Sequence, residues 1–234
     1  MRKTNSSLQK RISIAIYLLL SFGFMYAMSM SLTNKNLQTD KEKATDLLLD
    51  KKVNSHSAID ITEKKSVVND AANKREEESK QAFIEAYKVF MHPRCMNCHP
   101  SGDVPLQGDD SHLHTQGVKR GIDGRGLYAM KCKNCHQDTN LIGDNLPPGH
   151  PNWHLPPAER KMVFEGKSPR QLATGFKDPN FTGFNTMAKF LHHVEHDSLV
   201  KHSFTYGVKP PLSHADFVAK VREWIEKGAA LPDK

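Results

Sequence analysis

The sequence predicts an all-α domain wrapped by long loops, and three observations lead to this expectation. Two segments place apolar residues at helical spacing, one near residue 85 and one close to the C-terminus. Between them, proline and glycine cluster in stretches such as NLPPGHPNWHLPPAER, which are typical of loops. No run of alternating apolar residues lasts long enough to indicate a strand. We expect this domain to cover residues 80–234, after two segments of different character at 1–31 and 32–79.

The first segment, residues 1–31, has the composition of an export signal. Four basic residues within positions 1–11 precede ISIAIYLLLSFGFMYAMSM, which contains no charged residue. This apolar run is nearly long enough to span a bilayer, so a cleaved signal peptide and an uncleaved N-terminal membrane anchor both fit. A buried core helix is the third alternative, and the basic flank argues against it.

The second segment, residues 32–79, is rich in Lys, Asp, Asn, Ser and Glu and has no aromatic residue. Such a composition buries too little apolar surface to offset the entropy cost of ordering the chain. We therefore expect a polar flexible linker, with helical stretches near 47–49, that lets the domain reach away from a membrane.

Helices are expected at both ends of the domain. Apolar residues recur at helical spacing for two turns from Phe83, and Pro93 ends this helix. Near the C-terminus, Ser213 and Asp216 form a capping-box pattern, apolar residues recur over the next turns, and Gly228 marks the end. Shorter helices are expected between them, at 158–165 and 186–200.

All four cysteines belong to one repeated pattern, CMNCH and CKNCH. Cys-x-x-Cys-His is typical of covalent haem attachment, in which two thiols add to the porphyrin vinyl groups and the adjacent imidazole binds the iron. The sequence therefore predicts two covalently attached c-type haems. Their expected cofactor-binding residues are Cys95, Cys98, His99, Cys132, Cys135 and His136. His99 and His136 are the expected proximal iron ligands.

Other uses of the cysteines fit less well. A structural zinc site formed by four thiolates would bridge a gap of 33 residues between Cys98 and Cys132, and it would leave the two histidines unexplained. A redox dithiol needs a strand–helix context that the sequence does not show. Structural disulfides give no reason for repeating the whole pentapeptide.

The two motifs are close in sequence, with 32 residues between His99 and Cys132. This gap is too short for two complete helical domains, so the haems are expected to share one core, to which the porphyrins contribute apolar surface. A haem that transfers electrons normally has a second axial ligand, His or Met. The distal ligand candidates are His114, His154 and His193. Of the histidines in 192–196, His193 alone can turn toward a haem without breaking the apolar face of its helix.

Charge gives little support to an anionic macromolecular partner. The chain has a net charge of +7, but residues 81–234 hold 19 basic and 16 acidic side chains, and haem propionates would offset that excess. The sequence has no basic helix interleaved with aromatic residues, so nucleic acid binding is not expected.

Several stretches together carry a resemblance: HPRCMNCHPSGDVPLQGDD, VKRGIDGRG, MKCKNCH, PPGHPNWHLPPAERKMVFEGKSP and HDSLV. Over about residues 81–234 the chain resembles the small bacterial dihaem cytochromes c named as isoquinoline 1-oxidoreductase subunits. The resemblance implies a cytochrome c-like helical fold around two haems. It also implies an electron carrier, not itself an enzyme, on the periplasmic side of the cytoplasmic membrane, with a molybdopterin dehydrogenase as electron donor. Two alternatives stay open: a dihaem peroxidase-like enzyme with one open haem, and a zinc-binding interaction module.

Overall fold

The computed structural model describes the backbone of residues 50–143 and 146–234, with side chains from residue 68 onward. The expected leader at 1–31 and the first part of the expected linker lie outside these residues. Within the described part, no helix combines the length and the apolar character needed to cross a membrane. Residues Val68–Lys234 form one compact unit, which carries both cysteine motifs.

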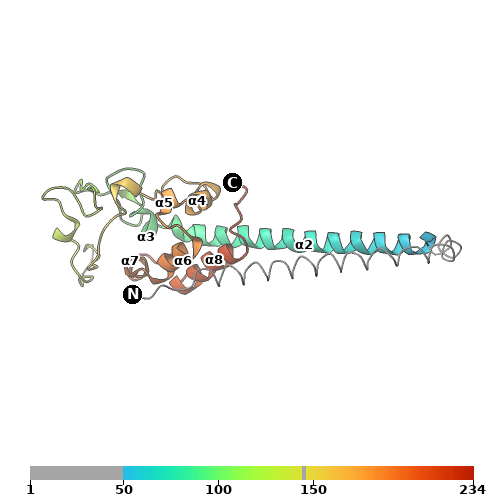
Figure 1. Cartoon of the computed structure of the whole chain (residues 1–234). Helices are drawn as coiled ribbons and strands as arrows, with labels where there is room; N and C mark the ends of the chain where they lie inside the picture. The colour runs from blue at the N-terminus through green and yellow to red at the C-terminus, as the bar shows by residue number, and fades with distance from the viewer. Residues whose placement is uncertain (1–49, 144–145) are drawn as a thin grey trace, which may run out of the picture. The chain divides into compact units, whose positions relative to one another are not determined.

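Helices dominate the described residues, in agreement with the expected fold class, and the one sheet has two short strands (Figure 1). In chain order the elements are α2 (Asp50–Phe90), α3 (Pro93–Met96), β1 (Leu106–Gln107), β2 (His112–Leu113), the 3₁₀ turns η1 (Cys132–Asn134) and η2 (Ala158–Arg160), α4 (Pro169–Phe176), α5 (Pro179–Thr182), α6 (Met187–His196), α7 (Ser198–His202) and α8 (His214–Glu226).

Helix α2 differs from the expected flexible linker, because residues 50–79 are helical. No Gly or Pro interrupts the sequence from residue 50 to Pro93, and residues 71–82 are rich in Ala, Glu, Lys and Gln, which favour helix. Ser79 is fully buried, and its hydroxyl donates to the carbonyl of Trp224 (2.8 Å). The packed part of the chain therefore begins before the expected boundary at residue 80.

The apolar core is built from aromatic side chains on four helices, α2, α4, α6 and α8. Phe176 on α4 is its centre, with its ring centroid 4.6 Å from that of Phe90 and 4.7 Å from that of Phe190. Phe83 packs against Trp224 of α8, with ring centroids 4.8 Å apart. All five side chains are at least 96% buried, so this cluster holds the helices together mainly by hydrophobic burial.

Most of the expected helices form, with two differences. In α8, Ser213 caps the helix by accepting from the backbone N–H of Asp216 (3.1 Å), as expected. The expected helix at 186–200 is divided at Asp197 into α6 and α7. The expected helix at 158–165 is wrong: only a 3₁₀ turn forms at its start, and further on the N–H of Phe164 donates to the carbonyl of His99 (2.9 Å) instead of continuing a helix.

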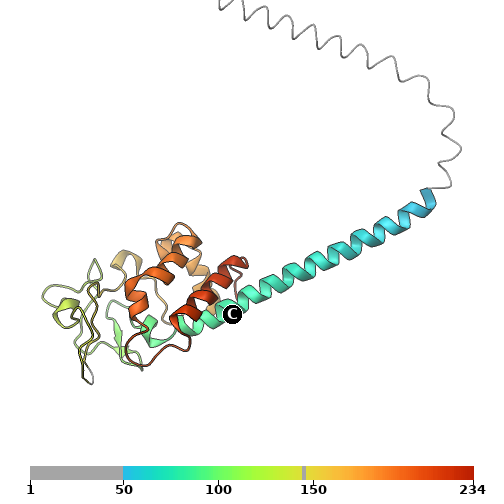
Figure 2. The same cartoon turned by 90° about the horizontal axis from the view of Figure 1, so that it is seen from below.

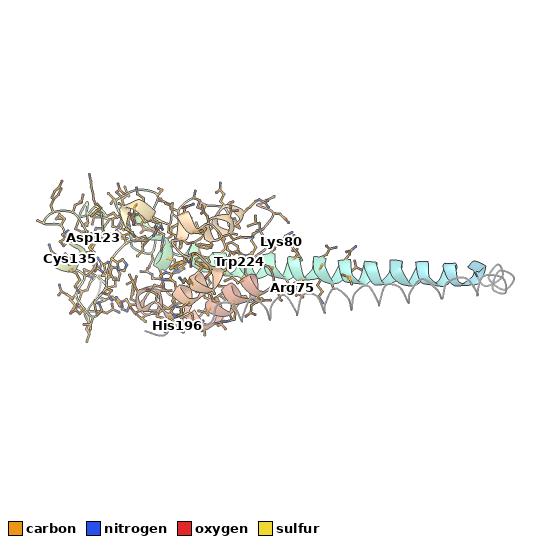
Figure 3. The ribbon with its side chains drawn as sticks, viewed as in Figure 1. Arg75, Lys80, Asp123, Cys135, His196 and Trp224 are labelled. Carbon is orange, nitrogen blue, oxygen red and sulfur yellow. The ribbon has the colours of Figure 1, made fainter. Side chains whose placement is uncertain are left out.

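Loops carry most of the chain between α3 and α4, and they occupy the end of the unit opposite the helical core (Figures 1 and 2). Figure 3 places Cys135 and Asp123 in this loop region and Trp224 among the helices. Arg120 is fully buried and joins the loops, because its guanidinium donates to the carbonyls of Pro156 (2.7 Å) and Gly102 (3.1 Å). The loop region is thus held by hydrogen bonds more than by an apolar core of its own.

Candidate cofactor sites

The two pentapeptides, motif 1 (95–99) and motif 2 (132–136), fold into the same kind of turn. The N–H of Cys98 donates to the carbonyl of Cys95 (3.1 Å), and the N–H of Cys135 donates to that of Cys132 (3.2 Å). Motif 1 follows α2 directly through α3, whereas motif 2 begins with η1. All four cysteines are free thiols, so both pairs are available for bonds to a cofactor.

The His99 imidazole is held in a fixed orientation. Its Nδ1 lies 2.8 Å from the carbonyl oxygen of Met162. Its ring stacks on Phe164, with centroids 3.9 Å apart and planes within 9° of parallel. Because a carbonyl can only accept, Nδ1 carries the proton and donates it, and the lone pair of Nε2 is left for a metal.

The His136 imidazole is held in the same way by other residues. Its Nδ1 donates to the carbonyl of Pro148 (2.7 Å), and its ring stacks on Trp153, with centroids 4.2 Å apart and planes 9° from parallel. Metal-bound histidines in proteins usually donate their second ring N–H to such a carbonyl. Both motif histidines therefore have the tautomer and the support of a proximal ligand.

Burial keeps both of these imidazoles neutral. Removal from water lowers the pKa of His99 to about 4, although its bond to Met162 acts in the opposite direction. Removal from water also lowers the pKa of His136. An imidazole must be neutral to bind a metal, so both side chains are in the ligating form near neutral pH.

The thiols of motif 1 are also neutral. Desolvation raises the pKa of Cys95 to about 12 and that of Cys98 to about 11, against the opposing charge of Arg94. Redox-active dithiols instead have lowered pKa values, so motif 1 does not resemble one. Charge repulsion from Cys132 of motif 2 also raises the pKa of Cys98. The two motifs therefore lie close enough for a charge on one to act on the other.

His114 is brought to motif 2 by the hairpin of β1 and β2. Leu106 pairs with Leu113, and directly after β2 the N–H of His114 donates to the carbonyl of Pro105 (2.9 Å). The His114 ring then lies 6.4 Å from the His136 ring, between centroids, at 56°. Its Nδ1 is buried without a hydrogen-bond partner.

This separation fits two imidazoles that share one metal ion. Metal–imidazole bonds are about 2 Å long. Adding about 1 Å from each nitrogen to its ring centre places two opposed ring centres roughly 6 Å apart. The separation of His114 and His136 would therefore allow both imidazoles to bind one metal ion, in keeping with His114 as a candidate ligand.

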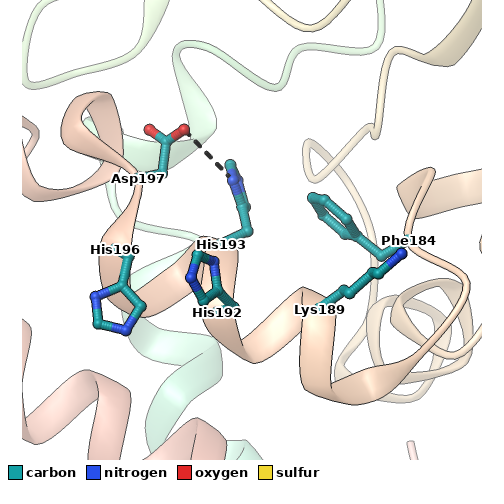
Figure 4. Close-up of a pocket in the computed structure, with 6 residues that line it drawn as sticks. All are labelled: Phe184, Lys189, His192, His193, His196 and Asp197. Carbon is teal, nitrogen blue, oxygen red and sulfur yellow. Dashed lines mark ion pairs between the residues drawn. The ribbon is translucent and has the colours of Figure 1, made fainter.

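His193 lies on the side of motif 1. Its charge lowers the pKa of His99, which places the two imidazoles within electrostatic range. Its Nδ1 faces the carboxylate of Asp197 at 3.5 Å, and Figure 4 shows this pair beside Phe184 in a surface pocket. His192 and His196 instead pack against each other, with ring centroids 4.6 Å apart and ring planes tilted by 55°.

His154 is the candidate that the structure does not bring to a motif histidine. Its Nδ1 donates to the carbonyl of Asn152 (2.5 Å) within its own loop. Among the described residues its ring takes no part in the aromatic contacts around His136, where the neighbouring Trp153 packs instead. The loop thus supplies an aromatic support for motif 2.

Sequence reasoning missed the residues that support the motif histidines. Phe164 and Trp153 stack on them, and Tyr206 connects the two regions because its ring lies 5.9 Å from that of Trp153 and 5.1 Å from the Arg94 guanidinium carbon. The one available signal was the aromatic residue next to a proline-rich loop in NWHLPP. This pattern indicates that the Trp153 side chain packs against another group, but it does not indicate which group.

Apolar side chains around motif 2 are exposed to an unusual degree for a folded domain. Ile122 and Tyr128 are 84% and 89% exposed. Other exposed apolar side chains in this region are Leu113, Met130, Leu141, Ile142 and Leu146. A large exposed apolar patch marks a place that another molecule covers, and these side chains are candidates to form one. A porphyrin attached to Cys132 and Cys135 would supply such a cover.

Comparison with protein families, with curated proteins and with solved structures finds no match for this chain. Within residues 68–143 and 146–234, no three or more His, Cys, Asp and Glu side chains converge as a metal site.

Proposed function

We propose that this chain is a dihaem c-type cytochrome that carries single electrons. The observation that carries the proposal is the equivalence of the two motifs. In each, the N–H of the second cysteine donates to the carbonyl of the first. Each also presents a neutral histidine whose Nδ1 donates to a backbone carbonyl and whose ring stacks on an aromatic side chain. Two equivalent sites with free thiols fit two covalently held haems better than they fit one shared metal ion.

The protein residues have separate tasks in this proposal. Cys95 and Cys98 would hold one porphyrin by thioether bonds, and His99 and His193 would be the ligands of its iron. Cys132 and Cys135 hold the other porphyrin. A second histidine pair, His136 and His114, would bind its iron. The haem iron supplies one-electron chemistry, and the chain fixes the ligands and excludes water around them.

A short path between the two sites supports transport through the protein. The thiols of Cys98 and Cys132 lie within electrostatic range, and the aromatic contacts of Tyr206 and Trp153 join motif 1 to His136. With a haem at each motif, this path would let an electron pass from one centre to the other inside one chain. We therefore propose a carrier with an entry site and an exit site.

The partner and the location are the finer part of the proposal. The resemblance to dihaem subunits of isoquinoline oxidoreductases favours a molybdopterin dehydrogenase as donor. The basic and apolar segment at residues 1–31 favours export to the periplasmic side of the cytoplasmic membrane, with the segment cleaved or kept as an anchor.

Low-temperature electron paramagnetic resonance tests the proposed function directly. The expected result for the oxidised protein is two low-spin signals, from two haems with two axial ligands each. A high-spin signal together with peroxide turnover would contradict the carrier function and favour a peroxidase-like enzyme. A colourless protein that contains zinc would contradict haem attachment altogether.

A further inference from the structure

We propose that Asp197 is a positioning residue that lowers the reduction potential of the centre at motif 1 by acting on the ligand His193. This inference rests on the proposed function, because it concerns the iron that His99 and His193 would share. It assigns a task to a side chain outside both motifs, and it makes the two centres electronically different.

The carboxylate of Asp197 is fixed in place by backbone groups. It stands between α6 and α7, where its Oδ1 accepts from the N–H groups of Leu199 (2.8 Å) and Val200 (3.1 Å). Its other oxygen, Oδ2, faces Nδ1 of His193 at 3.5 Å. Helix α7 thus anchors the carboxylate, and α6 carries the imidazole on which it acts. Figure 4 shows the Asp197 and His193 side chains facing each other.

The negative charge of Asp197 is available to His193. In the described part of the chain, no Lys or Arg forms an ion pair with this carboxylate, and the basic side chain that it faces is the His193 imidazole. A carboxylate that accepts the Nδ1 proton of a metal-bound histidine makes the imidazole a stronger electron donor. A stronger donor stabilises the oxidised metal more than the reduced metal, so the potential falls.

The other three candidate ligands lack this arrangement. His99 and His136 donate to the neutral carbonyls of Met162 and Pro148. The Nδ1 of His114 has no hydrogen-bond partner. Among these four histidines, only His193 therefore has a carboxylate beside its Nδ1. Removing that carboxylate should change the reduction potential of the motif 1 centre alone.

The test compares Asp197→Asn with unchanged protein, both with haem attached, in a redox titration followed by absorbance. Asparagine also caps helices well, so α7 should persist. The expected result is that one of the two midpoint potentials rises and the other stays, while both haems remain low-spin. Asp197→Glu should restore most of the original potential, because it returns the charge.

Asp178→Asn is the matched control. Asp178 caps α5 by accepting from the N–H of Asn180 (2.8 Å), so the same atoms change at another helix start, away from a candidate ligand. The control should leave both potentials unchanged. Unchanged potentials in Asp197→Asn, or equal shifts of both, would overturn the role of Asp197 while the dihaem proposal stands. Unmodified protein without two covalent haems would overturn the proposed function and this inference together.

Discussion

Each motif histidine depends on a partner that the motif itself does not contain. His99 donates to Met162, which is 63 residues further along the chain, and His136 donates to Pro148, which is 12 residues further along. These bonds select the tautomer that leaves Nε2 free. The pentapeptide pattern therefore selects His99 and His136 as candidate ligands, but it does not predict the groups that orient them.

Replacement of His114 tests the ligand pair at motif 2. The variant His114→Ala should convert one of the two haems from low-spin to high-spin, because the imidazole opposite His136 is lost. His154→Ala is the control and should leave both haems low-spin, since His154 bonds within its own loop. The absorbance and electron paramagnetic resonance spectra report the change. A high-spin haem in His154→Ala, with both haems low-spin in His114→Ala, would show that the ligand at motif 2 is misassigned.

Glu165 should make stability depend on acid pH. Its carboxylate accepts from the backbone N–H and the hydroxyl of Ser101 (2.7 Å each), and these bonds lower its pKa below the ordinary value of 4.5. The stabilisation is present above about pH 4.5 and is lost as the pH falls through the lower, folded-state pKa.

In urea titrations at a series of pH values, Glu165→Gln should therefore be less stable than the unchanged protein at neutral pH and nearly equal to it in acid. Glu159→Gln, at an exposed position, is the control and should follow the unchanged protein throughout. A constant difference at all pH values would show that the carboxylate charge is not the cause.

At the level of secondary structure, Ser79 tests where the packed unit begins. Its buried hydroxyl donates to the carbonyl of Trp224 and accepts from the N–H of Ala230 (3.1 Å). Loss of both bonds in Ser79→Ala should lower the free energy of unfolding by about 1–3 kcal/mol, since each hydrogen bond contributes about 0.5–1.5 kcal/mol.

Gln81→Ala, two residues later on the exposed side of α2, is the control and should change the free energy of unfolding by less than about 0.5 kcal/mol. Denaturant unfolding of both variants measures the difference. Equal effects would mean that residues before 80 contribute little to the unit.

Helices with a capped start and sustained apolar spacing could be predicted from the sequence, as α8 and the last turns of α2 show. The sequence analysis missed α4, although Ser168 and Gln171 form a complete capping box, because the helix is short. The expected helix at 158–165 does not form because the N–H of Phe164 donates to the carbonyl of His99. Long-range contacts of this kind override local preference.

At the level of the whole molecule, apolar burial is uneven. The helical core is rich in buried phenylalanine, whereas exposed apolar side chains gather between Leu113 and Leu146 around motif 2. The spacing of the cysteines predicts two attachment points, and the number of cofactors stays a prediction. The positions of His114 and His193 relative to the motifs could not be predicted, because they depend on the hairpin and on α6.

Loss of the cofactor at motif 2 should therefore loosen one part of the protein only. In the double variant Cys132→Ser and Cys135→Ser, limited proteolysis should cut between Leu113 and Ile142 several times faster, because nothing covers the apolar side chains there. The helical core should resist as before, since its aromatic cluster is independent of motif 2. Unchanged cleavage would contradict the proposal that a porphyrin covers and stabilises this region.

The measurement that tests the central claim most directly is the number of haems covalently bound to each chain. Protein purified from an exporting bacterial host that attaches c-type haem should be weighed by intact mass spectrometry, and its haem should be assayed by the pyridine haemochrome spectrum. The account predicts a mass increase of two haems per chain, which remains after extraction with acidified acetone. A chain that carries no covalent haem, or only one, would contradict it.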